Sequence, residues 1–388
     1  MDKTPAHNHK PKSQHKSKCK LSGKMIEPLQ LAGNEYIRNM VDNVFAGSGF
    51  NARRLAEACR VFSRMIDEDA TIALTIAGAM TPIGMSGPVI SLIENGFVDF
   101  IISTGANLYH DMHRPFNYPM FQGHFMVDDN DLAEREIARI YDVFIDDKDT
   151  LEATDMIIHR AAKDLPSREP ISTAHLHRVL GESIAKLAPA AEKSLLVAAA
   201  KYDVPVYTSA PGDSSIAMNL VVENIFNNPI ILDPVRDIIE TTSIVRAAKK
   251  NGVVEIGGGS PKNFYLQTQP TLAQILRDKT KGGHDYFIQL TTDSPHWGGL
   301  SGATPQEARS WGKIKDANIN NAVVYSCASI TFPILCQYVL SVNKPRKHRR
   351  LYGQLAELEK QLVQNAKANP VLLNDMAKIR SSLNGEGL

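Results

Sequence analysis

Short apolar runs alternate along the chain with longer segments in which apolar positions follow a helical period. Six runs rich in Val, Ile and Phe are predicted to be buried strands, most of them followed by Gly, Ser or Thr. They cover residues 71–77, 98–104, 204–208, 252–256, 286–291 and 322–326, and helix-length segments such as 88–95, 173–200 and 234–250 lie between them. Since strands that alternate with helices form parallel sheets covered on both faces, the pattern predicts an α/β fold with a doubly wound, mostly parallel sheet.

The two ends of the chain differ from this α/β body. Residues 1–24 contain seven Lys, three His and one Asp, which predicts a disordered basic tail that is either simply solvated or able to bind a metal or a polyanion. Residues 25–343 are predicted to form one domain, in which 164–170 is a surface connection. Residues 344–388 are expected to be a helical extension that packs on the body or on a neighbouring subunit. Its basic run is expected to be the solvated start of a helix marked by Leu351, Leu355, Leu358 and Leu362.

Composition narrows the possible functions. Among 388 residues, 43 Lys and Arg balance 42 Asp and Glu, so a net charge of +1 argues against a protein whose main partner is nucleic acid. Cys19, Cys59, Cys327 and Cys336 are scattered without metal-ligand spacing, which predicts neither a metal site nor a disulfide framework and favours a reducing, cytoplasmic compartment. The apolar stretch 332–342 is too short to span a bilayer, and we expect no membrane segment.

Ligands of parallel α/β sheets bind at the carboxyl ends of the strands, so the loops there are the first candidates for chemistry. Small residues in the segments 103–111 and 210–215 and in the triple glycine 257–259 would let a ligand approach the backbone. The glycines fit either a structural turn or a phosphate site at a helix start. Asp213 fits either a helix cap or a ribose ligand.

The segment 291–313 carries the strongest signal because it is polar, rich in Gly and contains both Trp residues of the chain. Glu307, Trp311 and Lys313 bring together a carboxylate, a flat aromatic wall and an amine. Such a set suits a cationic ligand. Lys313 is either a surface cation that covers an indole ring or, if burial or a nearby cation lowers its pKa, an imine-forming nucleophile.

Residues 302–314 read G-A-T-P-Q-E-A-R-S-W-G-K-I. This segment resembles the G-A-x-P-x-E-A-x-S-W-G-K-I signature of the deoxyhypusine synthase family. Ser103-Thr104-Gly105 stands where the family has a T-A-G-G loop, and Asp213 and the segment 257–262 match two further loops in order and spacing. The resemblance covers roughly residues 30–342 and is highly specific in S-W-G-K.

The resemblance implies a homotetramer of Rossmann-like subunits, with active sites between paired subunits. It implies a bound NAD that accepts a hydride from spermidine and later returns it, while the aminobutyl group rests on a lysine as an imine. By this implication residues 25–343 are an NAD-binding catalytic domain in which Lys313 is the nucleophile and Glu307 and Trp311 hold the polyamine. The positions that would contact NAD are Thr104, Gly105, Asp213, Gly257, Gly258, Gly298 and Ser301.

Several positions depart from the family pattern. Tyr109 and His110 replace two Glu before Asp111, Met218 and Leu300 each replace an Asp, and Asn263 replaces an active-site His. A hydrogen bond to a charged group is worth about 1.5–3 kcal/mol, so spermidine would lose much of its usual anchoring. Asp111, His110, Asp293 and His296 are therefore candidates for a rebuilt substrate pocket, for a diamine or a guanidine-bearing amine. Asn263 is a further candidate for substrate binding. His110 and His296 are equally well explained as ordinary loop residues.

The pattern resembles the bacterial, deoxyhypusine synthase-like branch of the family. That resemblance implies an NAD-dependent aminobutyl transferase of polyamine metabolism with a small amine acceptor, as in homospermidine-type synthesis. Two alternatives remain, namely a deoxyhypusine synthase that modifies a protein lysine and a non-catalytic scaffold that binds NAD or polyamine. The intact S-W-G-K argues against the scaffold, because a scaffold needs no nucleophile.

Overall fold

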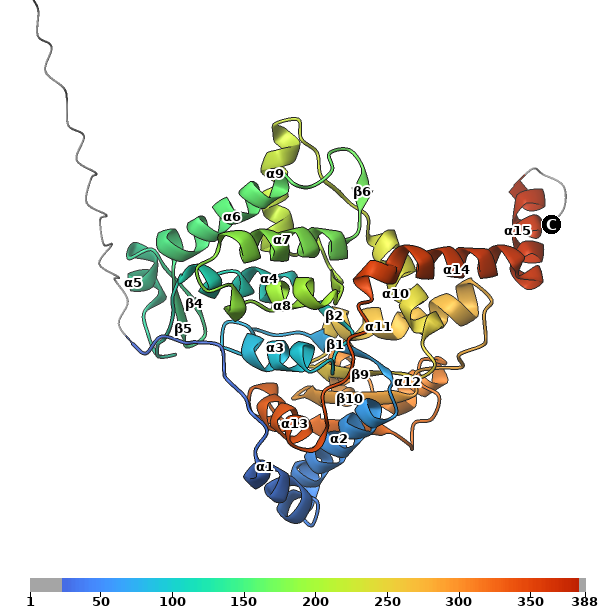
Figure 1. Ribbon diagram of the computed structural model, residues 1–388, viewed down its shortest axis with the longest axis horizontal. Coiled ribbons are helices and arrows are strands. Elements are labelled where there is room, and N and C mark those ends of the chain that lie inside the picture. Colours follow the sequence, from blue (N-terminus) through green and yellow to red (C-terminus); the bar gives the residue numbers. More distant parts are fainter. Residues whose placement is uncertain (1–22, 384–388) are drawn as a thin grey trace, which may run out of the picture.

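The computed structural model describes residues 23–383, so the predicted tail at 1–24 lies outside the described residues except for its last two. A six-stranded sheet forms the centre, with every neighbouring pair of strands parallel (Figure 1). Its strands are β1 (Thr71–Ile76), β2 (Phe100–Ser103), β7 (Val206–Thr208), β9 (Asn251–Ile256), β10 (Tyr286–Thr291) and β11 (Asn321–Tyr325). All six correspond to the predicted apolar runs, and the α/β, doubly wound fold class is confirmed.

The strand order is β11-β10-β9-β1-β2-β7, which in chain order is the 3-2-1-4-5-6 arrangement of Rossmann-type sheets. The chain first moves outward from β1 through β2 to β7, and then returns to place β9 on the other side of β1. β1 and β9 pair in register over their full lengths, from Thr71 with Asn251 to Ile76 with Ile256. The carboxyl ends of these two strands therefore form the switch point, where such sheets bind their ligands.

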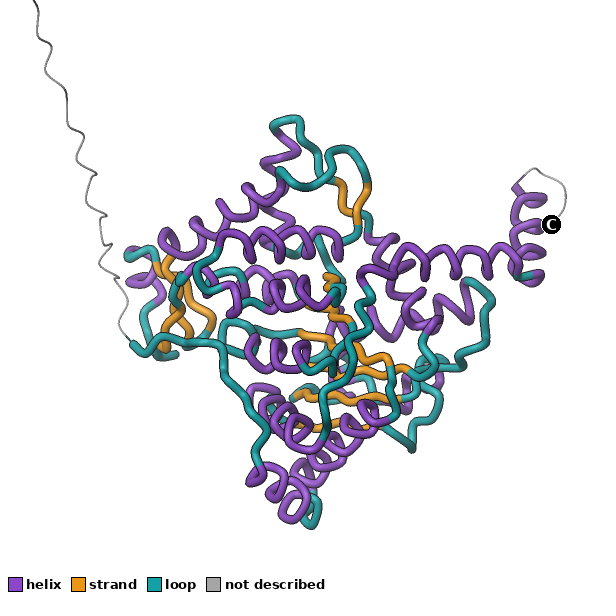
Figure 2. The backbone as a smooth tube through the Cα atoms, in the orientation of Figure 1, coloured by secondary structure: helices purple, strands orange, loops and turns teal. Residues whose placement is uncertain are grey.

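Helices cover both faces of the sheet, as Figure 2 shows. They are α1 (Glu35–Asn39), α2 (Phe50–Asp67), α3 (Ser86–Glu94), α4 (Gly105–Asp111), α5 (Asp129–Glu134), α6 (Ala153–Ala162), α7 (Thr173–Leu187), α8 (Leu195–Tyr202), α9 (Ser215–Ile225), α10 (Pro234–Ala247), α11 (Gly259–Pro270), α12 (Pro305–Ser310), α13 (Ala328–Val342), α14 (Leu355–Ala368) and α15 (Pro370–Leu383).

Two apolar clusters lie on opposite faces of the sheet because side chains alternate along each strand. Val254 and Ile256 of β9 belong to the cluster that includes α2, α3 and α13. Val253, which precedes Val254 and points to the other face, belongs to the cluster that includes α10, α11 and α14. The second face is the one that carries the candidate site.

Two parts of the structure differ from the sequence expectation. The segment 173–200 is not one helix, because Ala188 is extended before Pro189. After a short 3₁₀ turn at Ala191–Lys193, the next α-helix is α8, which Ser194 caps. A small antiparallel sheet, β3 (Met120–Gln122), β5 (Val143–Asp146) and β4 (Ile137–Ile140), and a two-stranded pair, β6 (Pro170–Ile171) and β8 (Ile231–Leu232), were not predicted. Their strands are too short to give a clear alternation of polar and apolar positions.

The chain after α13 returns along the body before α14 begins. The basic run in this segment is not a solvated helix start, since Arg346 is largely buried and Arg346 and Arg349 both lie beside the buried Asp99. Leu355 and Leu362 of α14 are buried in the cluster that includes α10, whereas α15 projects away from the body (Figure 1).

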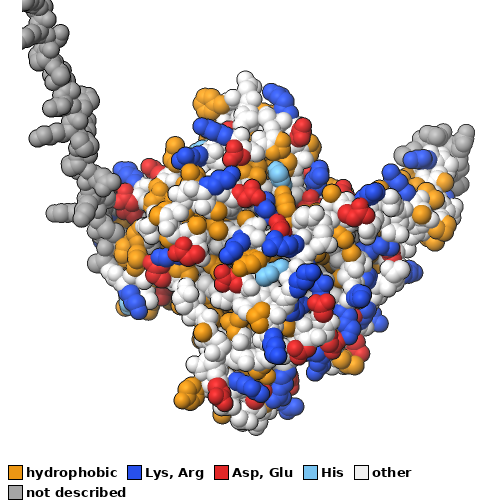
Figure 3. Space-filling model, viewed as in Figure 1, with side chains coloured by type: hydrophobic (Ala, Val, Ile, Leu, Met, Phe, Trp, Pro, Cys, Tyr) orange, Lys and Arg blue, Asp and Glu red, His pale blue; other side chains and the backbone are white. Residues whose placement is uncertain are grey.

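Charges of both signs are interspersed on the face in Figure 3, in line with the balanced composition. Within residues 23–383, the apolar helices all fall short of the length or hydropathy that crossing a bilayer requires. In the same range no group of three or more His, Cys, Asp or Glu is placed to hold a metal ion.

Candidate active site

The S-W-G-K motif follows a short helix whose start is fixed by reciprocal hydrogen bonds. The Thr304 hydroxyl accepts from the backbone N–H of Glu307, and the Glu307 carboxylate accepts from the backbone N–H of Thr304, both at 3.2 Å. Pro305 occupies the first helical position, where its missing N–H costs nothing. The helix α12 ends at Ser310 with Trp311 as its C-cap, and the chain then turns at Gly312, whose φ of +69° suits glycine. This frame places Glu307 at the start of α12 and Lys313 just beyond its end.

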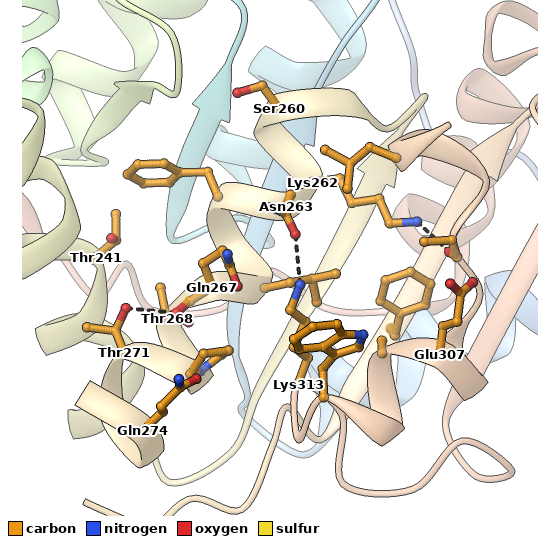
Figure 4. A pocket seen from close by; sticks show the side chains of 18 of the residues that line it. Thr241, Ser260, Lys262, Asn263, Gln267, Thr268, Thr271, Gln274, Glu307 and Lys313 are labelled. Atoms are coloured by element: carbon orange, nitrogen blue, oxygen red, sulfur yellow. Dashed lines mark hydrogen bonds between the residues drawn. The ribbon is translucent and has the colours of Figure 1, made fainter. Parts of the chain in front are cut away.

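The Lys313 amine lies at the centre of the candidate site, as Figure 4 shows. Its Nζ donates to the Asn263 Oδ1 at 2.9 Å and lies 6.0 Å from the centre of the Trp311 ring. The lysine side chain is half-buried, whereas Trp311 is 71% exposed. Burial lowers the pKa of Lys313, and the nearby Lys262 cation lowers it further. These surroundings favour the uncharged amine of Lys313 more than the surroundings of an exposed lysine would.

A cavity of about 800 Å³ opens beside Lys313, between α10, α11, the loop 295–303 and α12. Five of the predicted site residues line it, namely Lys313, Glu307, Trp311, Asn263 and Gly298. Figure 4 shows Lys262 and Glu307 on one side of Lys313 and the neutral side chains of Thr241, Gln267, Thr271 and Gln274 on the other. Glu307 is the one carboxylate among the described residues that line this cavity.

A buried hydrogen-bond network ties the glycine turn after β9 to the loop before α12. The Lys262 Nζ donates to the Gln289 Oε1 at 2.9 Å and to the Ala303 carbonyl at 2.7 Å. The Gln289 amide nitrogen donates to the carbonyls of Gly257 and Ser301, at 2.9 and 2.7 Å. The network fixes the loop relative to the sheet, and with it the segment that carries Lys313.

Lys262 and Gln289 were not among the predicted site residues. Their only signals in the sequence are a lysine in the first turn of the helix that follows the triple glycine, and a glutamine inside the apolar strand β10. Neither signal shows that the two side chains meet.

The predicted cofactor residues gather at the carboxyl edge of the sheet in two groups. Gly257, Gly258 and Ser301 form the first, at the switch point, where a Cβ on Gly258 would lie 2.6 Å from the Ser301 Cα and the Ser301 hydroxyl accepts from the Gly259 N–H. Gly298 has a φ of +74° and lies open beside them, since a Cβ there would meet no described atom within 4 Å.

The second group follows β2 and β7. Thr104 stands at the N-cap position of α4, where its hydroxyl accepts from the Asn107 side chain at 3.0 Å, and a Cβ on the next residue, Gly105, would lie 2.2 Å from the Ser214 Oγ. The α4 start is therefore pressed against the loop that carries the exposed Asp213. Glycine-rich turns and helix starts that converge at the carboxyl edge of a Rossmann-type sheet are a suitable environment for a dinucleotide.

Four predicted substrate residues do not line the cavity within this chain, namely Asp111, His110, Asp293 and His296. Asp111 is buried and accepts hydrogen bonds from the Ser194 hydroxyl at 2.6 Å and the Leu195 N–H at 3.0 Å, so it caps α8. Burial raises the pKa of Asp111 to about 6. The sequence alone offered no reason to expect this cap, because its partners lie more than 80 residues away.

The two histidines have other partners. The His110 Nδ1 lies 2.9 Å from the Nε2 of the buried His113, and burial lowers the pKa of His110 to about 4. His296 is exposed, bonded to the Ser294 hydroxyl at 2.7 Å and packed on Trp297. Of the two other replaced acidic positions, Leu300 lines the cavity, while Met218 is exposed on α9.

The fold and the site define an α/β protein of Rossmann topology in which a lysine and an indole line a cavity of about 800 Å³. Residues 40–339 match the family model described as deoxyhypusine synthase. The chain belongs to the deoxyhypusine synthase family and is a transferase.

Relatives at moderate identity support this assignment. A "Deoxyhypusine synthase-like protein" of Nostoc punctiforme is 40% identical over 342 residues, which cover 86% of this chain and 87% of the relative. A "Probable deoxyhypusine synthase 2" of Methanosarcina acetivorans is 36% identical over 303 residues, covering 78% and 86%. The crystal structure of a candidate deoxyhypusine synthase from Entamoeba histolytica shares the fold, with a TM-score of 0.56 at 17% identity, over 81% of this chain and 95% of that one.

Proposed function

We propose that this chain is an NAD-dependent aminobutyl transferase of polyamine metabolism, which carries the aminobutyl group on Lys313 and delivers it to a small amine, as in homospermidine-type synthesis. One observation carries the proposal. The Lys313 amine is half-buried and hydrogen-bonded to a neutral amide, and a second cation lies nearby. This environment favours the uncharged amine that imine formation requires.

The switch-point residues fit a bound NAD. Gly257, Gly258, Gly298 and Ser301 would hold one part of it, and Thr104, Gly105 and Asp213 are the candidates for the remainder. When bound, NAD would supply the hydride acceptor that oxidises the donor amine and the hydride that completes the product, so the transfer is redox-neutral overall.

The chain's own residues account for the carbon–nitrogen exchange. The Lys313 nitrogen attacks the oxidised donor carbon; a C–N bond to Lys313 forms, the C–N bond to diaminopropane breaks, and the departing nitrogen takes up a proton. The acceptor amine then attacks the same carbon and Lys313 leaves as a free amine. Asn263 holds the Lys313 nitrogen in place between these steps, and Trp311 offers a cation-binding ring face.

The cavity supports a small acceptor with few charges. Glu307 is its one carboxylate among the described lining residues, and Asn263 and Leu300 stand at positions where the family pattern has a His and an Asp. An acceptor with more ammonium groups would place the additional ones beside Thr241, Gln267 and Gln274, which offer dipoles but no charge. A diamine such as putrescine leaves fewer charges without a partner.

Assembly as a homotetramer is part of the same proposal. The outer face of α9 exposes Met218, Val221, Ile225 and Phe226, each more than half accessible in the single chain. Contiguous apolar side chains of this kind are typical of protein interfaces.

Borohydride trapping tests the proposed chemistry. The protein is incubated with NAD and with spermidine, putrescine or agmatine, singly and in pairs, then reduced, and both the intact mass and the small-molecule products are measured. We expect an aminobutyl adduct on Lys313 and a new polyamine when donor and acceptor are both present. Labelling that appears only with a protein acceptor would favour a protein-modifying synthase, and NAD binding without any adduct would favour a scaffold.

Two variants control this experiment. Lys313→Ala should abolish both adduct and product yet retain NAD binding. Lys313→Arg, which keeps the positive charge but forms no imine, should behave in the same way. Turnover near the wild-type rate in either variant would exclude covalent transfer through this lysine.

A further inference from the structure

Glu255 is a carboxyl group inside the sheet with no hydrogen-bond partner among the described residues. It lies on β9, one residue before the strand ends, is fully buried, and both of its carboxyl oxygens are unpaired within that part of the chain. Its neighbours in register are Thr75 on β1 and Gln289 on β10. The Thr75 hydroxyl is also buried without a described partner, whereas the Gln289 amide is used by Lys262 and the glycine turn. A buried carboxyl is costly unless it is paired, so its place here calls for a role other than packing.

The nearest cation to Glu255 belongs to the active site. The Glu255 Oε2 lies 4.0 Å from the Lys262 Nζ, and both side chains are almost completely buried. Lys262 in turn lines the cavity beside Lys313. Three ionisable groups, Glu255, Lys262 and Lys313, thus follow one another from the interior of the sheet to the cavity.

The charges of these three groups act on one another in opposite directions. The Lys262 cation lowers the pKa of Lys313, whereas an ionised Glu255 raises it. Burial raises the pKa of Glu255 to about 8, against the opposing effects of Lys262 and Lys313. Tyr265 on α11 also interacts electrostatically with Glu255, and the carboxylates of Glu307, which lines the cavity, and of Asp293 act on Lys262.

We propose that Glu255 is a positioning residue for the chemistry at Lys313, and that its carboxyl acts through Lys262 to set how much of the Lys313 amine is free. This inference rests on the proposed function. While Glu255 is neutral, Lys262 is a cation without a counter-charge and disfavours a second ammonium on Lys313. When Glu255 ionises, it offsets only part of the effect of Lys262, because the influence of Lys262 on Lys313 is the larger of the two, and Lys313 holds its proton more strongly.

Competitive acetylation with acetic anhydride measures this effect without NAD, polyamine or turnover. The reagent attacks only free amines, and peptide mass spectrometry gives the acetylated fraction of Lys313 against pH, with the exposed Lys367 as internal reference. Glu255→Gln keeps the shape but removes the ionisable group. We expect the Lys313 midpoint in Glu255→Gln to fall by about one pH unit, the order of shift that a nearby charge produces, with Lys367 unchanged. Glu255→Asp, which keeps the charge, should remain closer to the wild-type midpoint.

A second variant covers the possibility that Glu255→Gln does not fold because it leaves Lys262 buried and unpaired. The double variant Glu255→Gln/Lys262→Met removes both charges, and the Lys313 midpoint should then rise above that of the wild type. An unchanged midpoint in a folded Glu255→Gln protein, or a double variant whose midpoint equals the wild-type value, would overturn the inference. Failure of aminobutyl transfer would leave this measurement intact, so the two hypotheses fail separately.

Discussion

Single contacts decide the chemistry available to Lys313. An amide oxygen accepts from its Nζ at 2.9 Å, where a carboxylate would have stabilised the ammonium form more strongly. A buried lysine behind it and an exposed indole ring beside it complete the surroundings. Asp111, by contrast, has both oxygens engaged at the start of α8, so the acidic residue that the chain retains in that loop has a structural role within the subunit.

The Asn263 contact gives a prediction at this scale. Asn263→Ala removes the acceptor that orients the Lys313 amine, and we expect borohydride-trapped adduct to form about fivefold more slowly, since one hydrogen bond is worth about 1 kcal/mol. Gln267→Ala, on the opposite wall of the cavity, is the matched control for a lost polar side chain. An adduct rate in Asn263→Ala equal to that of the control would show that the contact does not matter.

Among the elements, α12 has more influence than its six residues suggest. A helix this short gains little from its own hydrogen bonds, and depends on the Thr304–Glu307 capping box and on Pro305 for its start. Lys262 and Gln289 fix the loop before α12 through hydrogen bonds to the carbonyls of Ala303 and Ser301. The position of Lys313 is therefore set from both sides of the short helix.

Removal of the Thr304 cap should reduce stability slightly and adduct formation more strongly. We expect Thr304→Ala to lower the free energy of unfolding by about 1 kcal/mol, measured by urea denaturation, because one N-cap hydrogen bond is lost. Adduct formation should fall more than this small change implies, because Glu307 and Lys313 both move with α12. Thr304→Ser retains the hydroxyl and should match the wild type in both measurements; an adduct rate in Thr304→Ala that also equals the wild-type rate would contradict this account.

At the scale of the whole molecule, the segment after α13 ties the end of the domain to the sheet. Asp99, just before β2, is fully buried and accepts from the Ile72 N–H at 2.8 Å, while Arg346 and Arg349 lie 3.3 and 3.5 Å from the same carboxylate oxygen. Arg346 also donates to the carbonyls of Gly96 and Ala70. One buried carboxylate thus connects β1, β2 and the chain that leads to α14.

Removing the Asp99 carboxylate should lower the free energy of unfolding. Asp99→Asn leaves two guanidinium groups without their buried counter-charge, and we expect a loss of about 3 kcal/mol in the free energy of unfolding, measured by urea denaturation. Asp69→Asn is the matched control: Asp69 contacts the same two arginines but is largely exposed, so its loss should cost less than about 1 kcal/mol. Equal losses of unfolding free energy in Asp99→Asn and Asp69→Asn would show that the burial of Asp99 does not make its contacts with Arg346 and Arg349 more stabilising.

Local pattern was sufficient for the central sheet and for the residues adjacent in sequence to the reactive lysine. All six strands were predictable because the strands of a buried parallel sheet are almost uniformly apolar, and β1, β2, β9 and β10 are buried along their whole length. Glu307, Trp311 and Lys313 were predictable because a single cap, helix and turn bring them together.

The tertiary structure alone decided the rest of the site. Glu255, Lys262 and Gln289 come from three elements and meet only because β9 and β10 pair in register beneath α11. In the same way, Asp111 accepts a hydrogen bond at the start of α8 and does not line the cavity. Hydrophobic periodicity fixes which face of an element is buried, but it carries no information about which distant polar groups share that buried space; the packing of whole elements determines those encounters.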